Sequence, residues 1–237
     1  MYKEYSVLMS VYQKECPEYL RAAITSIVNQ TLKAKEFVLV CDGPLTNALE
    51  QVLDEFSNIL ILVRLEKNVG LGMALAEGMR YCNCEWIVRM DSDDIAFPDR
   101  CKKQIIYVQQ HPEIDVLSGT VAEFEGSALT AEDAKQQVVS LKFVPETDRE
   151  IAEYIKFRNP INHPCVMFRK SKAAAAGGYQ QCHMFEDYDL WVRMFKNKCV
   201  FANLTDTILY MRVNNMHMRR GGISYACLLY TSPSPRD

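Results

Sequence analysis

Apolar and polar positions follow a regular order between residues 5 and 90. Short apolar runs of strand length are each followed by a longer segment in which apolar residues recur at helical spacing. The strands are predicted in 5–12, 35–44, at the start of 58–72 and in 85–90, with helices in 16–31, 46–56 and 73–82. This order predicts an α/β fold, with a mainly parallel, Rossmann-like sheet and helices on both of its faces.

The pattern is less regular in the second half of the chain. Helices are predicted in 98–113, 148–157 and 185–197, with a further one that Gly177 and Gly178 end. Strands are predicted in 114–124 and Cys165–Arg169, with one or two more in 199–213. The polar segment 128–140 is ambiguous and is predicted as a loop with a short helix. We expect this half to add a smaller β region to the main sheet.

Composition narrows the class of protein. The chain has 237 residues, 49% of them hydrophobic, which suits one α/β domain. A net charge of −3 gives no basic excess, so a nucleic acid is not expected as a partner. No apolar run is long enough to cross a membrane, and we expect no signal peptide. Nine cysteines at irregular spacing, without metal-ligand pairs, indicate a reducing cytosol.

Three aspartates, Asp91, Asp93 and Asp94, directly follow the predicted strand 85–90. Clustered carboxylates repel one another, so a cation is expected there, and their oxygens are ligands that Mg²⁺ and Mn²⁺ accept. Asp91 and Asp93 would point the same way if the strand continued, since side chains alternate along a strand. The alternative interpretation is an acidic turn in which Asp94 caps the next helix.

Further motifs accompany this cluster in a fixed order along the chain. They are "SVY" at 10–12, "CDG" at 41–43, "NVG" at 68–70, "MDSDD" at 90–94, "NHPCVMFRK" at 162–170 and "FEDYDLW" at 185–191. Together they resemble the family-2 glycosyltransferases of the GT-A fold that act in bacterial polysaccharide synthesis. The resemblance covers Tyr5 to Arg220 and implies a GT-A-like fold.

The resemblance implies roles for residues at the ends of the first three strands. Ser10 and Tyr12 occupy positions that line the nucleotide pocket. Asp42 matches an aspartate that holds the uracil edge; the family often has two acids here, and this chain keeps only the second. Asn68 and Gly70 match a loop near the nucleotide, although Asn68 could simply form the turn of that loop.

The remaining matches concern the reaction itself. Asp91 is expected to face the ribose and Asp93 to ligate the metal, so both are candidate metal residues. Asp187, in a pair with Glu186, matches the general base, and His163 matches a histidine near the diphosphate. The alternatives are structural: acids suit the first turn of a helix, and a single histidine is often only a hydrogen-bonding residue.

Three other features carry open expectations. Arg212 and the segment 217–222 match a C-terminal loop that folds over the donor. Arg89 and Arg100 are either partners of the aspartates or solvated side chains. Trp191 lies at helical spacing from apolar neighbours and is expected in the core.

The implied activity is inverting transfer of a sugar from a nucleotide-sugar, most simply a UDP-sugar, with Mn²⁺ or Mg²⁺. The expected acceptor is a glycan or a lipid-linked glycan, and the enzyme is expected in the cytoplasm or peripherally at the inner membrane face. Two alternatives stay open: a nucleotidyltransferase, and an inactive nucleotide- or glycan-binding domain. A nucleotidyltransferase would usually carry a glycine-rich loop after the first strand, and this chain has none there.

One domain is expected over residues 1–226, with a nucleotide-binding half (1–100) and an acceptor-side half (101–226) that is truncated. The last eleven residues, 227–237, have no periodic pattern and end in a Ser/Pro run. They resemble translated read-through of a sequencing adaptor and are expected to be a non-native tail.

Overall fold

The computed structural model describes residues 2–182 and 184–214, and the first half forms the predicted parallel sheet. Its strands run in the spatial order β3-β2-β1-β4. Their bounds are β1 Tyr5–Val11, β2 Glu36–Cys41, β3 Leu60–Arg64 and β4 Trp86–Met90, and the helices between them are α1 Pro17–Val28, α2 Asn47–Glu55 and α3 Leu71–Tyr81. All three strand pairings in this part are parallel, so the carboxyl ends of the four strands lie along one edge.

The second half continues the same sheet in the order β4-β8-β6-β9-β5, with β7 paired to β6. The elements are β5 Ile95–Ala96, α4 Arg100–Gln110, β6 Val116–Phe124, α5 Ala131–Gln136, β7 Val138–Lys142, α6 Asp148–Tyr154, η1 His163–Cys165, β8 Met167–Arg169, α7 Lys170–Ala175, α8 Glu186–Lys196 and β9 Phe201–Arg212. Pairing here is mixed, since β8 is antiparallel to both β4 and β6 whereas β9 is parallel to β6.

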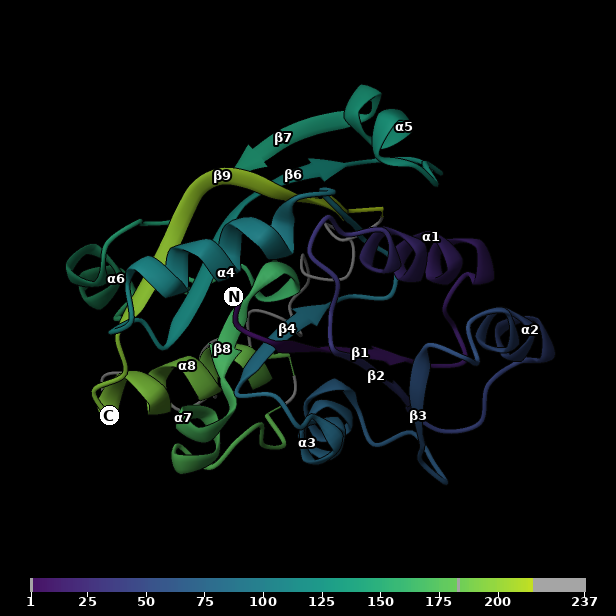
Figure 1. Cartoon of the computed structure of the whole chain (residues 1–237), viewed down its shortest axis with the longest axis horizontal. Coiled ribbons are helices and arrows are strands. Elements are labelled where there is room, and N and C mark those ends of the chain that lie inside the picture. Colours follow the sequence, from purple (N-terminus) through teal and green to yellow (C-terminus); the bar gives the residue numbers. More distant parts are fainter. Residues whose placement is uncertain (1, 183, 215–237) are drawn as a thin grey trace, which may run out of the picture.

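Two apolar clusters cover the two faces of the sheet, as the alternation of side chains along the strands requires. Val7 and Met9 of β1 pack with α1, α2 and α4 on one face. Leu8 of β1 packs with α3, α6, α7 and α8 on the other. Figure 1 shows α3, α7 and α8 on the side of the sheet opposite α1 and α4. The prediction of helices on both faces is therefore confirmed. Trp191 of α8 is fully buried, as expected of a core residue.

Four local predictions need correction. The ambiguous segment contains strand β7 as well as helix α5, and β5 was not predicted at all. Both strands are short and depend on pairing with β6 and β9, which a local pattern does not reveal. The helix expected from residue 98 begins at Arg100, and the strand expected at Cys165–Arg169 is split between η1 and β8.

The predicted reason for grouping Asp91 with Asp93 is also wrong. Strand β4 ends at Met90, and residues 91–94 bend away toward β5, so strand alternation does not set their directions. Nor does Asp94 cap the next helix, because its carboxylate accepts a hydrogen bond from the backbone N–H of Arg212 at 2.8 Å.

Candidate active site

The loops after β2 and β3 are locked together at the carboxyl edge of the sheet by Asp42. Its Oδ1 accepts a hydrogen bond from the N–H of Val69 at 2.7 Å, and its Oδ2 accepts one from the N–H of Gly70 at 3.1 Å. The Asn68 Nδ2 donates to the Asp42 carbonyl at 3.2 Å. Asp42 is 5% exposed, and its carboxylate fixes the backbone of the loop after β3.

Glycine is required where these loops touch. A Cβ on Gly43, whose φ is 86°, would lie 2.6 Å from the backbone nitrogen of Asn68. Gly70 begins α3 with a φ of 87°, a left-handed conformation that favours glycine. The structure thus brings Asp42, Asn68 and Gly70 together, as the sequence predicted.

Ser10 and Tyr12 lie beside this group at the end of β1. Ser10 pairs in register with Val40 of β2 and is half-buried, whereas the other residues of β1 are buried. The Tyr12 carbonyl accepts a hydrogen bond from the N–H of Glu15 at 3.1 Å, which closes a turn directly after β1. Both residues therefore sit at the edge where the other predicted donor-side residues lie.

A buried arginine holds the first aspartate of the acidic cluster. Arg89 of β4 is 1% exposed, and its guanidinium donates to both oxygens of Asp91, at 2.8 Å to Oδ2 and in a closer contact to Oδ1. Of the two alternatives for Arg89, a partner of the aspartates or a solvated side chain, the structure shows the first. Arg100 is also buried, and it donates to the Arg89 carbonyl at 2.6 Å instead of lying in solvent.

Among the described residues no arginine or lysine pairs with the carboxylate of the second aspartate, Asp93, although the charge of Arg212 acts to lower its pKa. Burial, followed by repulsion from Asp91 and Glu15, raises the pKa of Asp93 to about 7. Glu15, which the sequence analysis missed, is fixed by Ser92, whose hydroxyl donates to it at 2.5 Å. Excess negative charge at a partly buried carboxylate suits a divalent cation.

The described residues contain no group of three or more His, Cys, Asp or Glu side chains placed to hold a metal by themselves. A cation at Asp93 and Asp91 would therefore take further oxygens from its ligand. This is how Mg²⁺ is commonly held, with one or two carboxylates and substrate phosphates.

Arg212, the last residue of β9, contacts the loop that contains Asp93 and Asp94. Besides its N–H contact with Asp94, its Nε donates to the Asp93 carbonyl at 3.0 Å, and its guanidinium lies 3.6 Å from the centroid of the Tyr19 ring. It also donates to the carbonyls of Gly126 and Ala128, each at 2.6 Å. Arg212 is thus committed to internal contacts, and the associated segment 217–222 lies outside the described residues.

The predicted general base lies in the first turn of α8. Asp187 Oδ2 accepts a hydrogen bond from Asn159 Nδ2 at 2.7 Å, and its Oδ1 accepts one from the N–H of Tyr188 at 2.8 Å. Burial raises the pKa of Asp187, while these two donors and the charge of Arg89 oppose the rise. A raised pKa makes this carboxylate a better proton acceptor.

A further glycine, Gly72, lets the start of α3 come into contact with α8. A Cβ on Gly72, in the first turn of α3, would lie 2.8 Å from the Gln180 carbonyl and 2.9 Å from Cβ of Glu186. The start of α3 and the start of α8 are therefore packed directly against each other. This contact places the Glu186–Asp187 pair next to the loop that contains Asn68 and Gly70.

The profile of the family described as Glycosyl transferase family 2 matches residues 6–173, more than half of the chain. The chain belongs to this family. The nucleotidyltransferase alternative is accordingly not favoured. The match spans all of the donor-side edge, whereas the candidate base lies beyond it.

Curated relatives of this family-2 glycosyltransferase are similar over most of its length. The amylovoran biosynthesis glycosyltransferase AmsE of Erwinia amylovora is 41% identical, covering 93% of this chain and 81% of AmsE. An Escherichia coli enzyme named UDP-Gal:alpha-D-GlcNAc-diphosphoundecaprenol beta-1,3-galactosyltransferase is 34% identical, covering 94% of this chain and 79% of that enzyme.

Solved structures confirm the GT-A-like fold. S. aureus TarS in complex with UDP-GlcNAc matches 95% of this chain with a TM-score of 0.72 at 19% identity. The mannosyltransferase PcManGT of Pyrobaculum calidifontis, in complex with GDP-Man and Mn²⁺, matches 93% with a TM-score of 0.69 at 14% identity. This chain spans 64% and 60% of the length of those two chains, and at such identities the likeness concerns the fold.

His163 of the glycosyltransferase lies in an aromatic cluster. Its Nε2 is 2.8 Å from the hydroxyl of Tyr179, and its ring meets that of Trp191 edge-on. Burial, assisted by the charge of Arg89, lowers the pKa of His163 well below its usual value. The ring is therefore neutral, and it brings no positive charge to a diphosphate.

Among residues 2–182 and 184–214, every helix is too short or too polar to cross a bilayer. Within the same ranges the cysteines are free thiols.

Proposed function

We propose that this glycosyltransferase moves a sugar from a UDP-sugar, with inversion, to a hydroxyl of a glycan carried on a lipid diphosphate. The name of AmsE supports a role in polysaccharide synthesis, and the name of the E. coli relative supports both the UDP-sugar and the lipid-linked acceptor. UDP-GlcNAc in TarS supports a UDP-linked donor on this fold.

The observation that carries this proposal is that two separate groups of carboxylates interact with one buried cation, Arg89. Asp91 and Asp93 follow β4, Asp187 lies in the first turn of α8, and the charge of Arg89 acts on both Asp91 and Asp187. One centre suits a metal and a diphosphate, and the other suits proton abstraction. Inverting transfer needs both in one site, because a hydroxyl must lose its proton as the diphosphate leaves.

On the donor side, Asp93 with Asp91 would hold Mn²⁺ or Mg²⁺. The bound cation would neutralise charge on the departing diphosphate. The base of the nucleotide would lie against a wall formed by Asp42, Asn68 and Gly70. Ser10 and Tyr12 would line the pocket beside that wall. The bidentate contact from Arg89 holds the Asp91 carboxylate in one orientation.

On the acceptor side, Asp187 would take the proton of the attacking hydroxyl. Its Oδ2 is bound by Asn159 and its Oδ1 by Tyr188 N–H, so the carboxylate is held in one orientation, and each oxygen keeps a free lone pair. Glu186 is the second acidic residue at this position. We further propose that the enzyme acts in the cytoplasm, peripherally at the inner membrane face where a lipid-linked acceptor would lie.

A transfer assay tests the proposal. Purified protein with Mn²⁺ is given UDP-galactose, UDP-glucose or UDP-N-acetylglucosamine and a water-soluble acceptor, GlcNAc-diphosphate with a short alkyl chain. We expect product from at least one donor, with a β-linkage visible in the anomeric NMR coupling. An α-linked product, or no product with any of the three donors, contradicts the proposal.

A further inference from the structure

Glu15 lies in the turn after β1 and contacts the acidic loop, residues 91–94, that follows β4. Its Oε2 accepts a hydrogen bond from the Ser92 hydroxyl at 2.5 Å, and its Oε1 accepts one from the backbone N–H of Cys16 at 2.9 Å. Ser92 is 7% exposed and stands between Asp91 and Asp93, the two candidate metal residues. A hydroxyl that donates to a carboxylate at this distance makes a short, charge-assisted hydrogen bond. Glu15 is therefore tied to the middle of the acidic loop.

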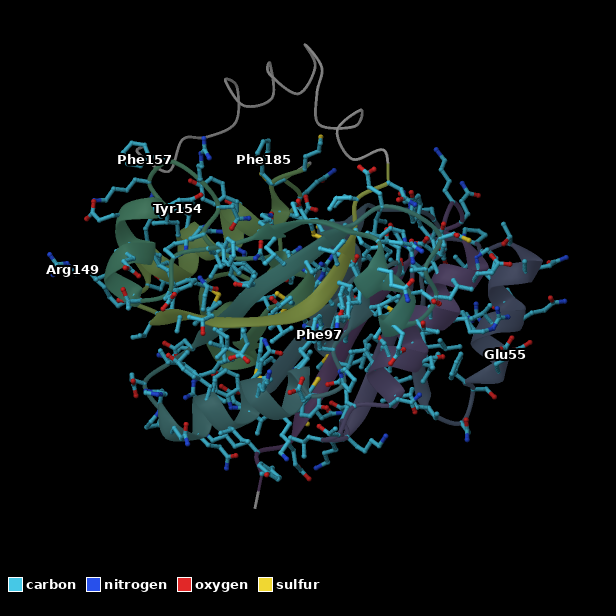
Figure 2. The ribbon with its side chains drawn as sticks, turned by 90° about the horizontal axis from the view of Figure 1, so that it is seen from above. Glu55, Phe97, Arg149, Tyr154, Phe157 and Phe185 are labelled. Carbon is cyan, nitrogen blue, oxygen red and sulfur yellow. The ribbon has the colours of Figure 1, made fainter. Side chains whose placement is uncertain are left out.

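Other contacts hold both ends of this loop. At its start, the buried Arg89 binds the carboxylate of Asp91. Beyond its end, β5 pairs with β9, and the ring of Phe97 stacks on that of Tyr210 with centroids 4.4 Å apart. Figure 2 shows Phe97 close to the ribbon of β9. Because both ends are fixed, the contact with Glu15 acts on the one residue that separates the two candidate metal aspartates.

The charge of Glu15 reaches the candidate metal site as well. Repulsion from Glu15 contributes to the raised pKa of Asp93, after burial and the charge of Asp91, so the carboxylates of Glu15 and Asp93 lie within electrostatic range. Among the described residues, Arg89 is the one cation that forms an ion pair with any of the four carboxylates Glu15, Asp91, Asp93 and Asp94. Uncompensated like charges repel one another until a cation binds among them, so each of them adds to the affinity for a divalent cation.

Glu15 is placed to support a metal and not to ligate it directly. One of its oxygens is bound by the Ser92 hydroxyl and the other by the Cys16 N–H. In the described part of the chain, no three carboxylates are arranged to hold one ion between them. Residues that bind and orient the segment carrying the metal ligands commonly change metal affinity by about 10- to 100-fold.

We infer that Glu15 is a positioning residue of the donor metal site: it holds Ser92 between the two metal aspartates, and its negative charge raises the affinity for the divalent cation. The inference rests on the proposed function, because it takes Asp91 and Asp93 as the residues that hold the metal. It predicts opposite effects on affinity and on stability, since the charge that attracts the cation repels the aspartates while the cation is absent.

Glu15→Gln removes the charge and keeps the shape of the side chain. The Mn²⁺ concentration that gives half of the rise in Tm at a fixed concentration of UDP should increase about tenfold. The Tm without ligand should equal or exceed that of the wild type, because repulsion is relieved. Glu18→Gln is the matched control: Glu18 is exposed in the first turn of α1 and accepts from the Cys16 thiol at 3.0 Å, and its loss should leave the Mn²⁺ concentration unchanged.

Ser92→Ala tests the hydrogen bond separately, because it leaves the charge of Glu15 in place. The Mn²⁺ concentration at half of the Tm rise should increase about threefold, as expected for the loss of one hydrogen bond. At saturating Mn²⁺, Glu15→Gln and Ser92→Ala should both transfer sugar at the wild-type rate.

The inference is overturned if either variant keeps the wild-type Mn²⁺ concentration. It is also overturned if the transfer rate of Glu15→Gln stays low at saturating Mn²⁺, since that pattern indicates a role in folding or in the reaction itself. Wild type decides the proposed function separately. If UDP with Mn²⁺ neither stabilises the wild-type protein nor supports transfer, the proposed function fails, and the role of Glu15 fails with it. If wild type responds and the variants match it, the role of Glu15 alone is wrong.

Discussion

The donor edge and the acceptor side of this enzyme are built in different ways. At the donor edge, Asp42 and Arg89 are buried and bound to neighbouring loops or side chains, at the ends of parallel strands. On the acceptor side, Asp187 is half-buried in the first turn of α8, where one side-chain amide and one backbone N–H hold it. In the proposed function, the rigid edge serves the nucleotide that many donors share, whereas the more exposed start of α8 is free to vary with the acceptor.

The largest expected effect is a loss of transfer rate that leaves the binding of UDP unchanged. Asp187→Asn keeps the shape of the base but cannot take a proton, so we expect the transfer rate to fall about 10³-fold. UDP binding in the presence of Mn²⁺ should stay at the wild-type level. Asp189→Asn is the matched control, because Asp189 lies in the same helical turn but pairs with Arg193 at 2.7 Å. Equal losses in the two variants would argue against Asp187 as the base.

Removing the side chain of Arg89 should lower the stability of the fold, on which both regions depend. Arg89→Met leaves Asp91 without its partner, and its carboxylate is 33% exposed. We expect the free energy of unfolding to fall by about 2 kcal/mol, below the ~3–5 kcal/mol of a fully buried pair. Urea unfolding measures the change. The surface pair Arg21–Glu55 is the control, since Arg21→Met should cost less than about 1 kcal/mol.

Asn159→Ala should act on the acceptor side alone. Asn159 donates to the charged form of Asp187, so its loss raises the pKa of Asp187 and loosens the carboxylate. We expect kcat to fall about tenfold, and the acidic limb of the kcat/KM profile to move to higher pH. Asn159→Ser, which keeps a donor, should recover part of the loss. A lower kcat with an unmoved pH profile would assign Asn159 to folding only.

The smallest effect concerns His163. Its pKa is well below 6.5 in the folded state, so below pH 6.5 the unfolded chain binds a proton that the folded chain does not. The stability contributed by the neutral ring is therefore complete above pH 6.5 and is lost as the pH falls, by up to about 1.4 kcal/mol between pH 6.5 and 5.5. Aspartates with raised pKa values change stability in the opposite direction, so the difference between wild type and His163→Gln isolates the histidine. A flat difference curve would contradict its buried, neutral state.

Residues at the ends of strands could be placed from the sequence for a physical reason. Asp42 and the aspartates after β4 are close in sequence to the strands that carry them, so hydrophobic pattern and turn residues were sufficient to locate them at the carboxyl edge. Glu15 and Asn159 reach their sites through tertiary contacts that have no local signal. Strand β7 was missed because it is largely exposed and exists by pairing with β6. The expected domain limits at 1–226 and the tail after it extend beyond the described residues and stay predictions.

Titration of UDP with and without Mn²⁺, followed by thermal stability, tests the donor-site assignment most directly. A ligand that binds only the folded state stabilises it, by about 2.7 kcal/mol at a hundred times Kd. We predict that UDP raises the Tm of wild type only when Mn²⁺ is present, and that Asp93→Ala abolishes this rise while Asp187→Asn keeps it. A rise that is independent of Mn²⁺, or one that Asp93→Ala retains in full, would contradict the assignment of Asp93 to the metal and of this edge to the nucleotide diphosphate.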